Sequence, residues 1–372
     1  MKAYNEFVNN KSITDKPTGI EHADRLQLNE QMFQFQKDIT VWALKRGRAC
    51  IWSGCGTGKT IMELEWANHV AEYTQKPVLI LAPLAVSEQT ANEEAVKFGY
   101  ECRIAASQKD IRQGINITNY EKMDKFNFDI FGGVVLDESG IIKHQSGKIR
   151  NMIIEKTQNV PFRLGCTATP APNDFMEIGN QAEFIGAMKY REMLSMFFVH
   201  DGGDTAKWRL KGHAKGEFFK WVAQWAVVLR KPSDLGYSDC GFDLPKLNIY
   251  HVVTKTEAQD GFLFPVEAKT LQERIRARRD TIDSRVKAAI DIINKNKNDK
   301  NRLWCIWCNL NAEADAIKKA RPGIVNIQGS DSVEYKAENL LAFSRGDIEE
   351  IVSKPKIAGF GMNMQNCHNS IF

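Results

Sequence analysis

The sequence predicts an α/β fold built from two doubly wound parallel sheets, with a helical insertion between them. Three observations lead to this prediction. Short, continuously apolar runs alternate with segments of helical periodicity through most of the 372 residues, which is typical of strands and helices in a parallel sheet. The alternation stops between residues 174 and 240. Polar motifs follow several of the apolar runs, at the strand ends where such sheets bind ligands.

The first α/β series is expected over residues 31–173, after an N-terminal extension of residues 1–30. It begins with helical spacing at 33–45, and a strand, a glycine-rich turn and a second helix follow over 49–73. The run at 78–81 is continuously apolar, as expected for a strand covered on both faces. Further strands are expected at 115–118, 134–136 and 162–166, and the remaining helices at 86–98 and 149–157.

A helical, aromatic and basic insertion is expected over residues 174–240, and a second α/β series over 241–372. In the second series the apolar runs predict strands at 247–253, 303–308, 324–327 and 350–352, and helical spacing predicts helices at 271–294, 312–320 and 333–343. No helix follows the last apolar run. The second lobe is therefore expected to be incomplete.

The bulk composition narrows the class of protein without identifying it. The 50 basic and 46 acidic residues leave a net charge of +4, which permits a nucleic-acid partner but does not argue for one. Eight scattered cysteines, several of them inside apolar runs, indicate a reducing cytoplasm. No run reaches the ~18–20 consecutive apolar residues of a membrane span, so no membrane partner is expected.

Residues 53–60, with the sequence SGCGTGKT, form a glycine-rich turn between a predicted strand and a predicted helix. Apart from Ser53 at the first position, they match the phosphate-loop pattern, in which backbone N–H groups wrap phosphates. In this pattern Lys59 reaches the β- and γ-phosphates and the Thr60 hydroxyl binds Mg²⁺. The alternative is a chance glycine-rich turn, which the position between strand and helix disfavours. The candidate ATP-binding residues of the turn are Gly54, Gly56, Thr57, Gly58, Lys59 and Thr60.

Two adjacent acids, Asp137 and Glu138, end the predicted strand at 134–136. In phosphate-loop ATPases an acid at this place holds Mg²⁺, and a second acid can orient or activate the attacking water. The alternative for an acid after a strand is a helix N-cap. With the phosphate loop present, we take Lys59, Asp137 and Glu138 as the catalytic candidates. Thr60 and Asp137 are the candidate ligands of Mg²⁺.

Several short motifs follow one another in a definite order along the chain. They are Gln36, APLAV at 82–86, TNYE at 118–121, DESG at 137–140, TATP at 167–170, the apolar run at 303–309, and GFGMNMQ at 359–365. Each motif is weak by itself. As an ordered set that extends over most of the chain, they resemble the superfamily 2 helicases, specifically the SWI/SNF-type and phage DEAD/DEAH-box branch.

The resemblance implies two RecA-like lobes with ATP between them and nucleic acid across both. It implies that Gln36 reads the adenine base, and that Thr167 and Thr169 couple hydrolysis to lobe movement. The residues that it assigns to nucleic-acid contact are Pro83, Asn119, Tyr120, Gly361, Asn363 and Gln365.

The expected function is that of an ATP hydrolase with Mg²⁺ as its cofactor, a helicase or translocase that moves on duplex DNA. The family's motif VI, which carries arginine fingers, is not found before Phe372. An arginine finger contributes ~10³–10⁵ in rate, so a chain truncated before motif VI is expected to hydrolyse ATP poorly. The alternative function is a module that binds ATP and DNA with negligible turnover. A small-molecule kinase, the third hypothesis, does not predict a second α/β lobe.

The resemblance also sets expectations about partners and place. Phage or host replication and recombination proteins are the expected protein partners, and the bacterial host cytoplasm is the expected compartment if the protein is phage-encoded. Ser139 and Gly140 replace the last two residues of the DEAD/DEAH box. This departure weakens the expectation of strand separation and leaves the expectation of ATP binding unchanged.

Three further stretches each have two interpretations. The CxxC at 305–308 is apolar and has no second ligand pair, so a buried strand is favoured over a metal or redox site. The arginine-rich stretch at 274–287 fits either a phosphate-tracking helix or a solvated helix face. In the insertion, basic residues at 207–215 suit DNA contact. The following aromatic stretch at 218–225 is expected to pack its apolar side chains into a core.

Overall fold

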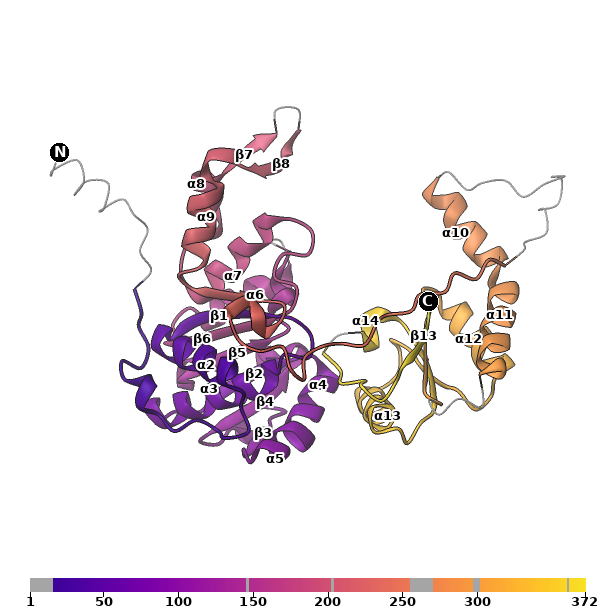
Figure 1. The fold of residues 1–372 in the computed structure, drawn as a ribbon, viewed down its shortest axis with the longest axis horizontal. Helices are drawn as coiled ribbons and strands as arrows, with labels where there is room; N and C mark the ends of the chain where they lie inside the picture. The colour runs from indigo at the N-terminus through magenta and orange to yellow at the C-terminus, as the bar shows by residue number, and fades with distance from the viewer. Residues whose placement is uncertain (1–15, 145–146, 202–203, 255–269, 297–301, 360) are drawn as a thin grey trace. The chain divides into compact units, whose positions relative to one another are not determined.

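The computed structural model describes residues 16–144, 147–201, 204–254, 270–296, 302–359 and 361–372. The chain divides into two compact units, Met1–Leu244 and Pro245–Phe372 (Figure 1). Each unit is built around its own parallel sheet. The predicted fold class, α/β with two doubly wound parallel sheets, is confirmed.

The first unit contains a sheet of seven strands in the order β3-β4-β2-β5-β6-β1-β9, and every neighbouring pair is parallel. The strands are β1 (Arg48–Ser53), β2 (Val78–Ala82), β3 (Cys102–Ile104), β4 (Ile115–Asn119), β5 (Gly133–Asp137), β6 (Phe162–Thr167) and β9 (Ala226–Leu229). The four strands β1, β2, β5 and β6 are buried almost throughout. Their continuous apolar runs therefore gave a clear sequence signal.

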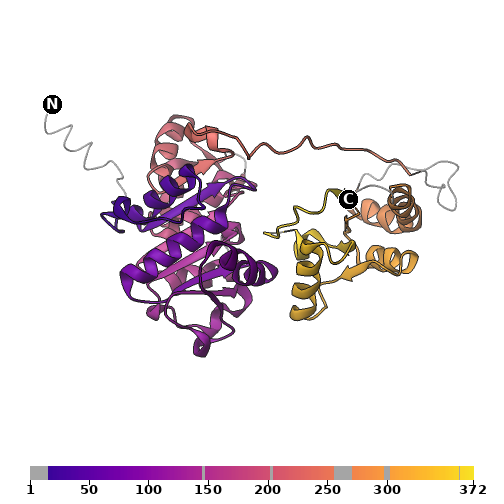
Figure 2. The same cartoon turned by 60° about the horizontal axis from the view of Figure 1, so that its bottom comes forward.

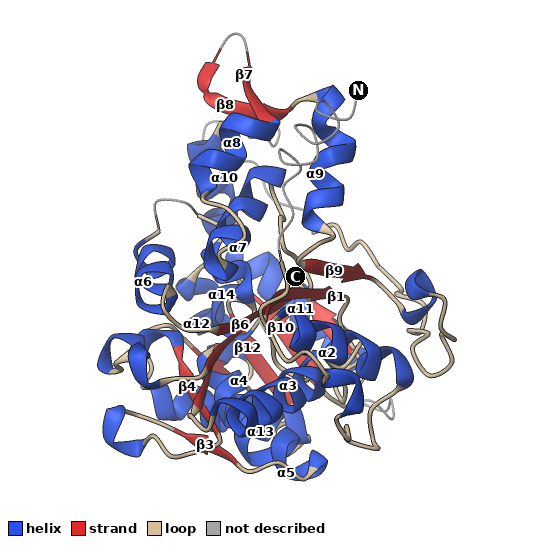
Figure 3. Ribbon diagram, turned by 90° about the vertical axis from the view of Figure 1, so that its left-hand side faces the viewer, coloured by secondary structure: helices blue, strands red, loops and turns tan. Residues whose placement is uncertain are grey.

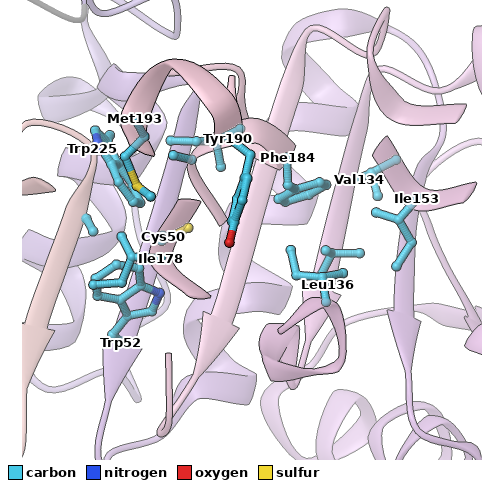
Figure 4. Close-up of a cluster of buried hydrophobic side chains, with 14 of the residues drawn as sticks. Cys50, Trp52, Val134, Leu136, Ile153, Ile178, Phe184, Tyr190, Met193 and Trp225 are labelled. Atoms are coloured by element: carbon cyan, nitrogen blue, oxygen red, sulfur yellow. The ribbon is translucent and has the colours of Figure 1, made fainter. Parts of the chain in front are cut away.

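Helices cover both faces of this sheet. They are α2 (Gln34–Arg46), α3 (Lys59–Thr74), α4 (Leu84–Gln89), α5 (Ala95–Phe98), α6 (Lys148–Thr157), α7 (Ile178–Ile185), α8 (Tyr190–Phe197) and α9 (Lys215–Val222), and a π-helical turn, Thr90–Glu94, joins α4 to α5. On one face, Val134 and Leu136 of β5 share a core with Ile153 of α6 and residues of α7 (Figure 4). The opposite face meets α3, because a Cβ on Gly133 would lie 2.8 Å from Val70.

The expected helical stretch at 174–240 contains α7, α8 and α9, and it also contains β structure. Strands β7 (Phe198–Asp201) and β8 (Asp204–Leu210) form an antiparallel hairpin that projects beyond α8 and α9 (Figure 3). Phe218, Trp221 and Val222 of α9 and the following Trp225 lie in the core of the first unit, as expected, whereas Phe219 of the same helix is exposed. Strand β9 then joins the main sheet beside β1, which the sequence analysis did not predict.

The second unit contains a sheet of four parallel strands in the order β11-β12-β10-β13. The strands are β10 (Trp304–Trp307), β11 (Val325–Ile327), β12 (Glu350–Ser353) and β13 (Asn369–Ile371). The helices are α10 (Leu271–Asp280), α11 (Ile282–Lys295), α12 (Asn311–Ala320), α13 (Val333–Arg345) and α14 (Pro355–Ala358). Helices α11 and α12 share a core with β10 and β12.

Two details of the second unit differ from the prediction. The strand expected at 247–253 is wrong: this segment is extended and pairs with no strand of the described residues (Figure 2). Leu247 and Val253 are 79% and 89% exposed. Apolar side chains do not make a strand when no neighbour takes up the backbone hydrogen bonds. The single helix expected at 271–294 is broken at Thr281, whose ψ is 8° and whose hydroxyl donates to the carbonyl oxygen of Ala277 at 2.8 Å.

No helix among the described residues is both long enough and apolar enough to cross a bilayer.

Candidate functional site

The turn between β1 and α3 has the backbone of a phosphate-binding loop. Gly56 and Gly58 have φ values of 77° and 80°, in the left-handed region that glycine enters at no steric cost. Gly58 is the N-cap of α3, which begins at Lys59. The first N–H groups of this four-turn helix therefore point into the loop, where a helix N-terminus favours an anion.

Side chains of the loop form hydrogen bonds with groups at its start. The ammonium group of Lys59 donates to the carbonyl oxygens of Ser53 and Gly54, both at 3.2 Å. The hydroxyl of Thr57 donates to the Gly54 carbonyl oxygen at 2.7 Å and lies 2.9 Å from the Ser53 hydroxyl. Ser53 and Thr57 are both buried. Serine at the first position of the pattern thus supplies a hydroxyl partner for Thr57, which explains this departure.

Strand β9 holds the other side of the loop. The N–H of Gly54 donates to the carbonyl oxygen of Leu229 at 2.9 Å. A Cβ on Gly54 would lie only 2.5 Å from the carbonyl oxygen of Arg230. Glycine is therefore required at this position by the close approach of a neighbouring backbone.

Gln36, expected to read adenine, lies against the loop. Its Nε2 donates to the Thr57 carbonyl oxygen at 2.8 Å, and its Oε1 accepts from the N–H of Phe33 at 2.9 Å. The side chain is 3% exposed. A Cβ on Gly58 would lie 2.3 Å from Gln36 Nε2. Helix α2 thus carries a residue that fixes the shape of the loop.

The two acids follow β5 at the same edge of the sheet. Asp137 is the last residue of β5, and Glu138 has a left-handed backbone with φ 56°, a conformation that costs energy for any residue except glycine. The Thr167 hydroxyl donates to Glu138 Oε2 at 3.3 Å and accepts from the N–H of Thr169 at 3.2 Å. The acids and the two threonines assigned to coupling therefore meet at the ends of β5 and β6. Gly140 lies next to both threonines, since a Cβ built on it would be in ordinary contact with Thr167 Oγ1, at 3.5 Å, and with the Thr169 carbonyl oxygen, at 3.5 Å.

Burial and repulsion between like charges raise the pKa values of two carboxyl groups at this edge of the sheet. Burial raises the pKa of Asp137 to about 7, with a further contribution from the charge of Glu138, whereas Lys59 lowers it. Glu63 of α3 was not identified from the sequence. Burial and the charge of Asp137 hold the pKa of Glu63 well above its usual range. The carboxyl groups of Glu63, Asp137 and Glu138 therefore lie close enough to one another and to Lys59 to interact electrostatically.

Glu63 is 1% exposed, and its carboxyl group lies beside the Cys166 thiol, which lowers the pKa of Glu63 against the effect of burial. Its Oε1 has no hydrogen-bond partner among the described residues. The sequence contained a signal for it. An acid four residues after Lys59, on the helix side that also carries Trp66 and Val70, lies where the helical period places core residues.

The donor set fits Mg²⁺ better than a metal that needs many protein ligands. Within the described ranges no group of three or more His, Cys, Asp or Glu side chains could hold a metal ion. Mg²⁺ at phosphate loops uses one or two protein oxygens, with phosphates and water supplying the rest. The Thr60 hydroxyl and the Asp137 carboxylate are such oxygens. The excess of carboxyl groups over cations at this edge also favours a divalent cation.

The residues assigned to nucleic-acid contact lie in different settings. Pro83 is the half-buried N-cap of α4. Asn119 and Tyr120 are both buried: Asn119 caps a short helix through the N–H of Lys122, and Tyr120 donates to the Asp137 carbonyl oxygen at 2.6 Å. The remaining three, Gly361, Asn363 and Gln365, lie in the loop between α14 and β13 of the second unit. Tyr120 therefore holds the backbone of Asp137, and its buried ring is not exposed for stacking with a base.

The structure also describes most of the CxxC, of the arginine-rich stretch and of the basic stretch at 207–215. Cys305 and Cys308 are buried on and just after β10, as the strand interpretation predicted. The arginines of α10 are exposed, which leaves both interpretations of that helix open. In the basic stretch at 207–215, the side chain of Lys207 lies outside the described part, and Lys211 donates to the carbonyl oxygens of Ser195 and Met196.

Residues 21–172 match the sequence profile of the family described as Type III restriction enzyme, res subunit. The matched range is less than half of the chain. It contains Gln36, the phosphate loop, both acids and both threonines. The resemblance to superfamily 2 helicases is confirmed over this range.

A curated phage protein is also similar to this chain. Protein p41 of Acyrthosiphon pisum secondary endosymbiont phage 1 is 29% identical over 164 residues. The similarity covers 37% of this chain and 35% of the phage protein. This chain therefore matches about a third of the length of that relative.

Two solved structures resemble the chain at low identity. The Sulfolobus solfataricus SWI2/SNF2 ATPase core in complex with double-stranded DNA is 16% identical, with a TM-score of 0.48 over 88% of this chain and 78% of that chain. The UvsW helicase from bacteriophage T4 is 18% identical, with a TM-score of 0.38 over 51% of this chain and 76% of that chain.

Proposed function

We propose that the chain is a motor that couples ATP hydrolysis to movement on duplex DNA, because residues 21–172 match the family described as Type III restriction enzyme, res subunit, and the ordered motifs resemble those of superfamily 2 helicases. One observation carries this proposal. The phosphate loop, the acids Asp137 and Glu138, and Thr167 all lie at one edge of a single parallel sheet. This edge is where doubly wound sheets bind nucleotides.

The side chains have distinct tasks in this proposal. Lys59 balances the charge of the β- and γ-phosphates, and the loop N–H groups hold their oxygens. Thr60 and Asp137 would hold Mg²⁺, which would supply positive charge to the phosphates. Glu138 orients the attacking water and accepts its proton. The hydrogen bond from Thr167 to Glu138 connects this glutamate to the TATP motif at 167–170. In this proposal, a change at the γ-phosphate reaches that motif through this bond.

Nucleic acid is the second substrate in this proposal. Pro83 and the segments that follow Asn119 and Thr169 leave the sheet at the same edge as the phosphate loop. Gly361, Asn363 and Gln365 of the second unit are the proposed contacts on its side. The assignment of these residues to DNA comes from the resemblance. Asn119 and Tyr120 contribute by shaping the loop, since both side chains are buried.

The decisive experiment measures phosphate release with duplex DNA, single-stranded DNA, RNA or no nucleic acid. We expect duplex DNA to stimulate turnover most, Lys59→Ala to abolish ATP binding and turnover, and Glu138→Gln to abolish turnover while leaving binding intact. Equal stimulation by RNA and duplex DNA would contradict the proposed substrate. Normal binding of an ATP analogue with background turnover in the unaltered chain would favour the non-catalytic binding module.

A further inference from the structure

Glu63 occupies a position from which it can act on the Mg²⁺ end of the site. It lies four residues after Lys59 in α3, so the two side chains share one side of the helix. That side faces the sheet, because a Cβ on Gly133 would meet both Val70 and Trp66. Glu63 is therefore held between the helix and the sheet, one turn below the phosphate loop.

The register of the sheet places Asp137 on the same side. In a strand, residues two apart point to one face, so Asp137 faces α3 as Gly133 does. Asp137 of β5 is the register partner of Cys166 in β6, and side chains paired in register share a face. The Cys166 thiol in turn lies beside the Glu63 carboxyl group, and each affects the pKa of the other. Glu63 and Asp137 are thus neighbours on the α3 face of the sheet.

The carboxyl group of Glu63 is incompletely satisfied. Its Oε1 is buried and has no partner in the part of the chain that the structure describes, a condition that native proteins rarely leave without water or a ligand. Glu65, two residues further along α3 and equally buried, is a useful contrast. It has hydrogen bonds with His69, Tyr100 and the N–H of Asn29. The open oxygen therefore belongs to the glutamate beside Asp137 and not to the one remote from it.

We propose that Glu63 is a positioning residue for Mg²⁺, and that its open oxygen accepts a hydrogen bond from a water molecule bound to the ion held by Thr60 and Asp137. This inference rests on the proposed ATP-binding function. A water-mediated role fits, because these carboxyl groups do not form a direct metal site and Mg²⁺ keeps several of its water ligands. Residues that bind the water or the ligands of a metal commonly affect its affinity 10- to 100-fold.

The test compares the affinity of the full chain for a fluorescent ADP analogue in excess Mg²⁺ and in EDTA. Three variants are needed. Glu63→Met removes the oxygen, Glu63→Asp withdraws it by one methylene, and Glu63→Gln keeps an acceptor oxygen at the same reach. Glu65→Gln is the matched control on the same helix. Binding of Mn²⁺ to the nucleotide complex, followed by its paramagnetic signal, gives a second readout that does not depend on turnover.

We expect the enhancement of affinity by Mg²⁺ to fall about 10- to 100-fold in Glu63→Met and Glu63→Asp, with affinity in EDTA unchanged. Glu63→Gln should retain most of the enhancement, and Glu65→Gln all of it. An unchanged enhancement in Glu63→Met and Glu63→Asp would overturn the inference, as would equal losses in Mg²⁺ and in EDTA, which would indicate a purely structural role. If the unaltered chain bound no nucleotide in either condition, the proposed function itself would fail.

Discussion

The side-chain amide of Gln36 donates to the carbonyl oxygen of Thr57 at 2.8 Å, and this bond joins helix α2 to the phosphate loop. The same side chain accepts the N–H of Phe33, so the start of α2 and the middle of the loop are held by one buried amide. A residue in this position acts on the shape of the loop whichever base the nucleotide carries.

Gln36→Ala should therefore weaken ATP and GTP binding by similar factors. Loss of a hydrogen bond of ~0.5–1.5 kcal/mol corresponds to roughly a two- to twelvefold change in affinity. Titration of the variant with both nucleotides measures the two factors. A loss confined to ATP would instead support adenine reading, the role that the family resemblance implies.

Gly54→Ala should disrupt the loop by steric conflict. The new Cβ would lie 2.5 Å from the carbonyl oxygen of Arg230, so β9 and the loop must move apart. We expect nucleotide affinity to fall at least tenfold and thermal stability to decrease. Gly216→Ala in α9 is the control, because a Cβ there meets nothing within 4 Å and alanine in a helix stabilises by about 0.4–1 kcal/mol. Retained nucleotide affinity in Gly54→Ala would show that the loop does not depend on its contact with β9.

Tyr120→Phe should lower ATP turnover more than ATP binding. The phenol donates to the carbonyl oxygen of Asp137, and both groups are buried. Its loss should cost about 1–3 kcal/mol of folding free energy and loosen the backbone that carries the acids. Urea denaturation and steady-state kinetics measure the two effects, with Tyr73→Phe on the exposed side of α3 as the control. A turnover equal to that of the unaltered chain would argue against a role for this bond in catalysis.

Glu65 should make the stability of the chain depend on pH in acid. Burial alone would raise the pKa of Glu65, but hydrogen bonds from His69, Tyr100 and Asn29 lower it below the ordinary value of 4.5. A carboxyl group with a lowered pKa in the folded state stabilises the fold above its unfolded pKa, and this contribution disappears as the pH falls through the folded pKa.

Glu65→Gln should therefore cost about 1.5–3 kcal/mol near pH 7, as expected for hydrogen bonds to a charged group. The difference from the unaltered chain should shrink below about pH 4.5. Free energies of unfolding in urea, measured at both pH values for both proteins, provide the check. A difference that grows toward low pH would contradict the direction of the pKa shift.

The sequence allowed prediction of those parts of the site that depend on local pattern. The residues of the phosphate loop and the pair Asp137 and Glu138 could be identified because each follows a strand that is apolar throughout. A strand of that kind places its last residue at one edge of the sheet whatever the rest of the fold does. The contact between Glu138 and Thr167 follows from the same rule, since β5 and β6 are neighbours.

Features that depend on long-range packing were not predictable in this way. Nothing local indicates that Ala226–Leu229 pairs with β1, because its partner lies far away in the chain. The segment at 247–253 has the composition of a strand but no strand partner in the part of the chain that the structure describes. Tyr120 belongs to a motif that resembles a nucleic-acid contact, yet the depth of the sheet buries it. Glu63 is one of several charged residues on α3, and only the register of the sheet places it beside Asp137.

The placement of β9 also brings two distant parts of the first unit together around the phosphate loop. Leu229, the last residue of β9, holds Gly54 through its carbonyl oxygen. The chain that follows returns to α2, where Phe242 packs against Phe33 and Phe35 and Tyr237 is hydrogen-bonded to Asp38. The segment after β9 therefore contacts both the loop and the helix that carries Gln36. A nucleotide loop enclosed in this way depends for its shape on residues far away in the sequence.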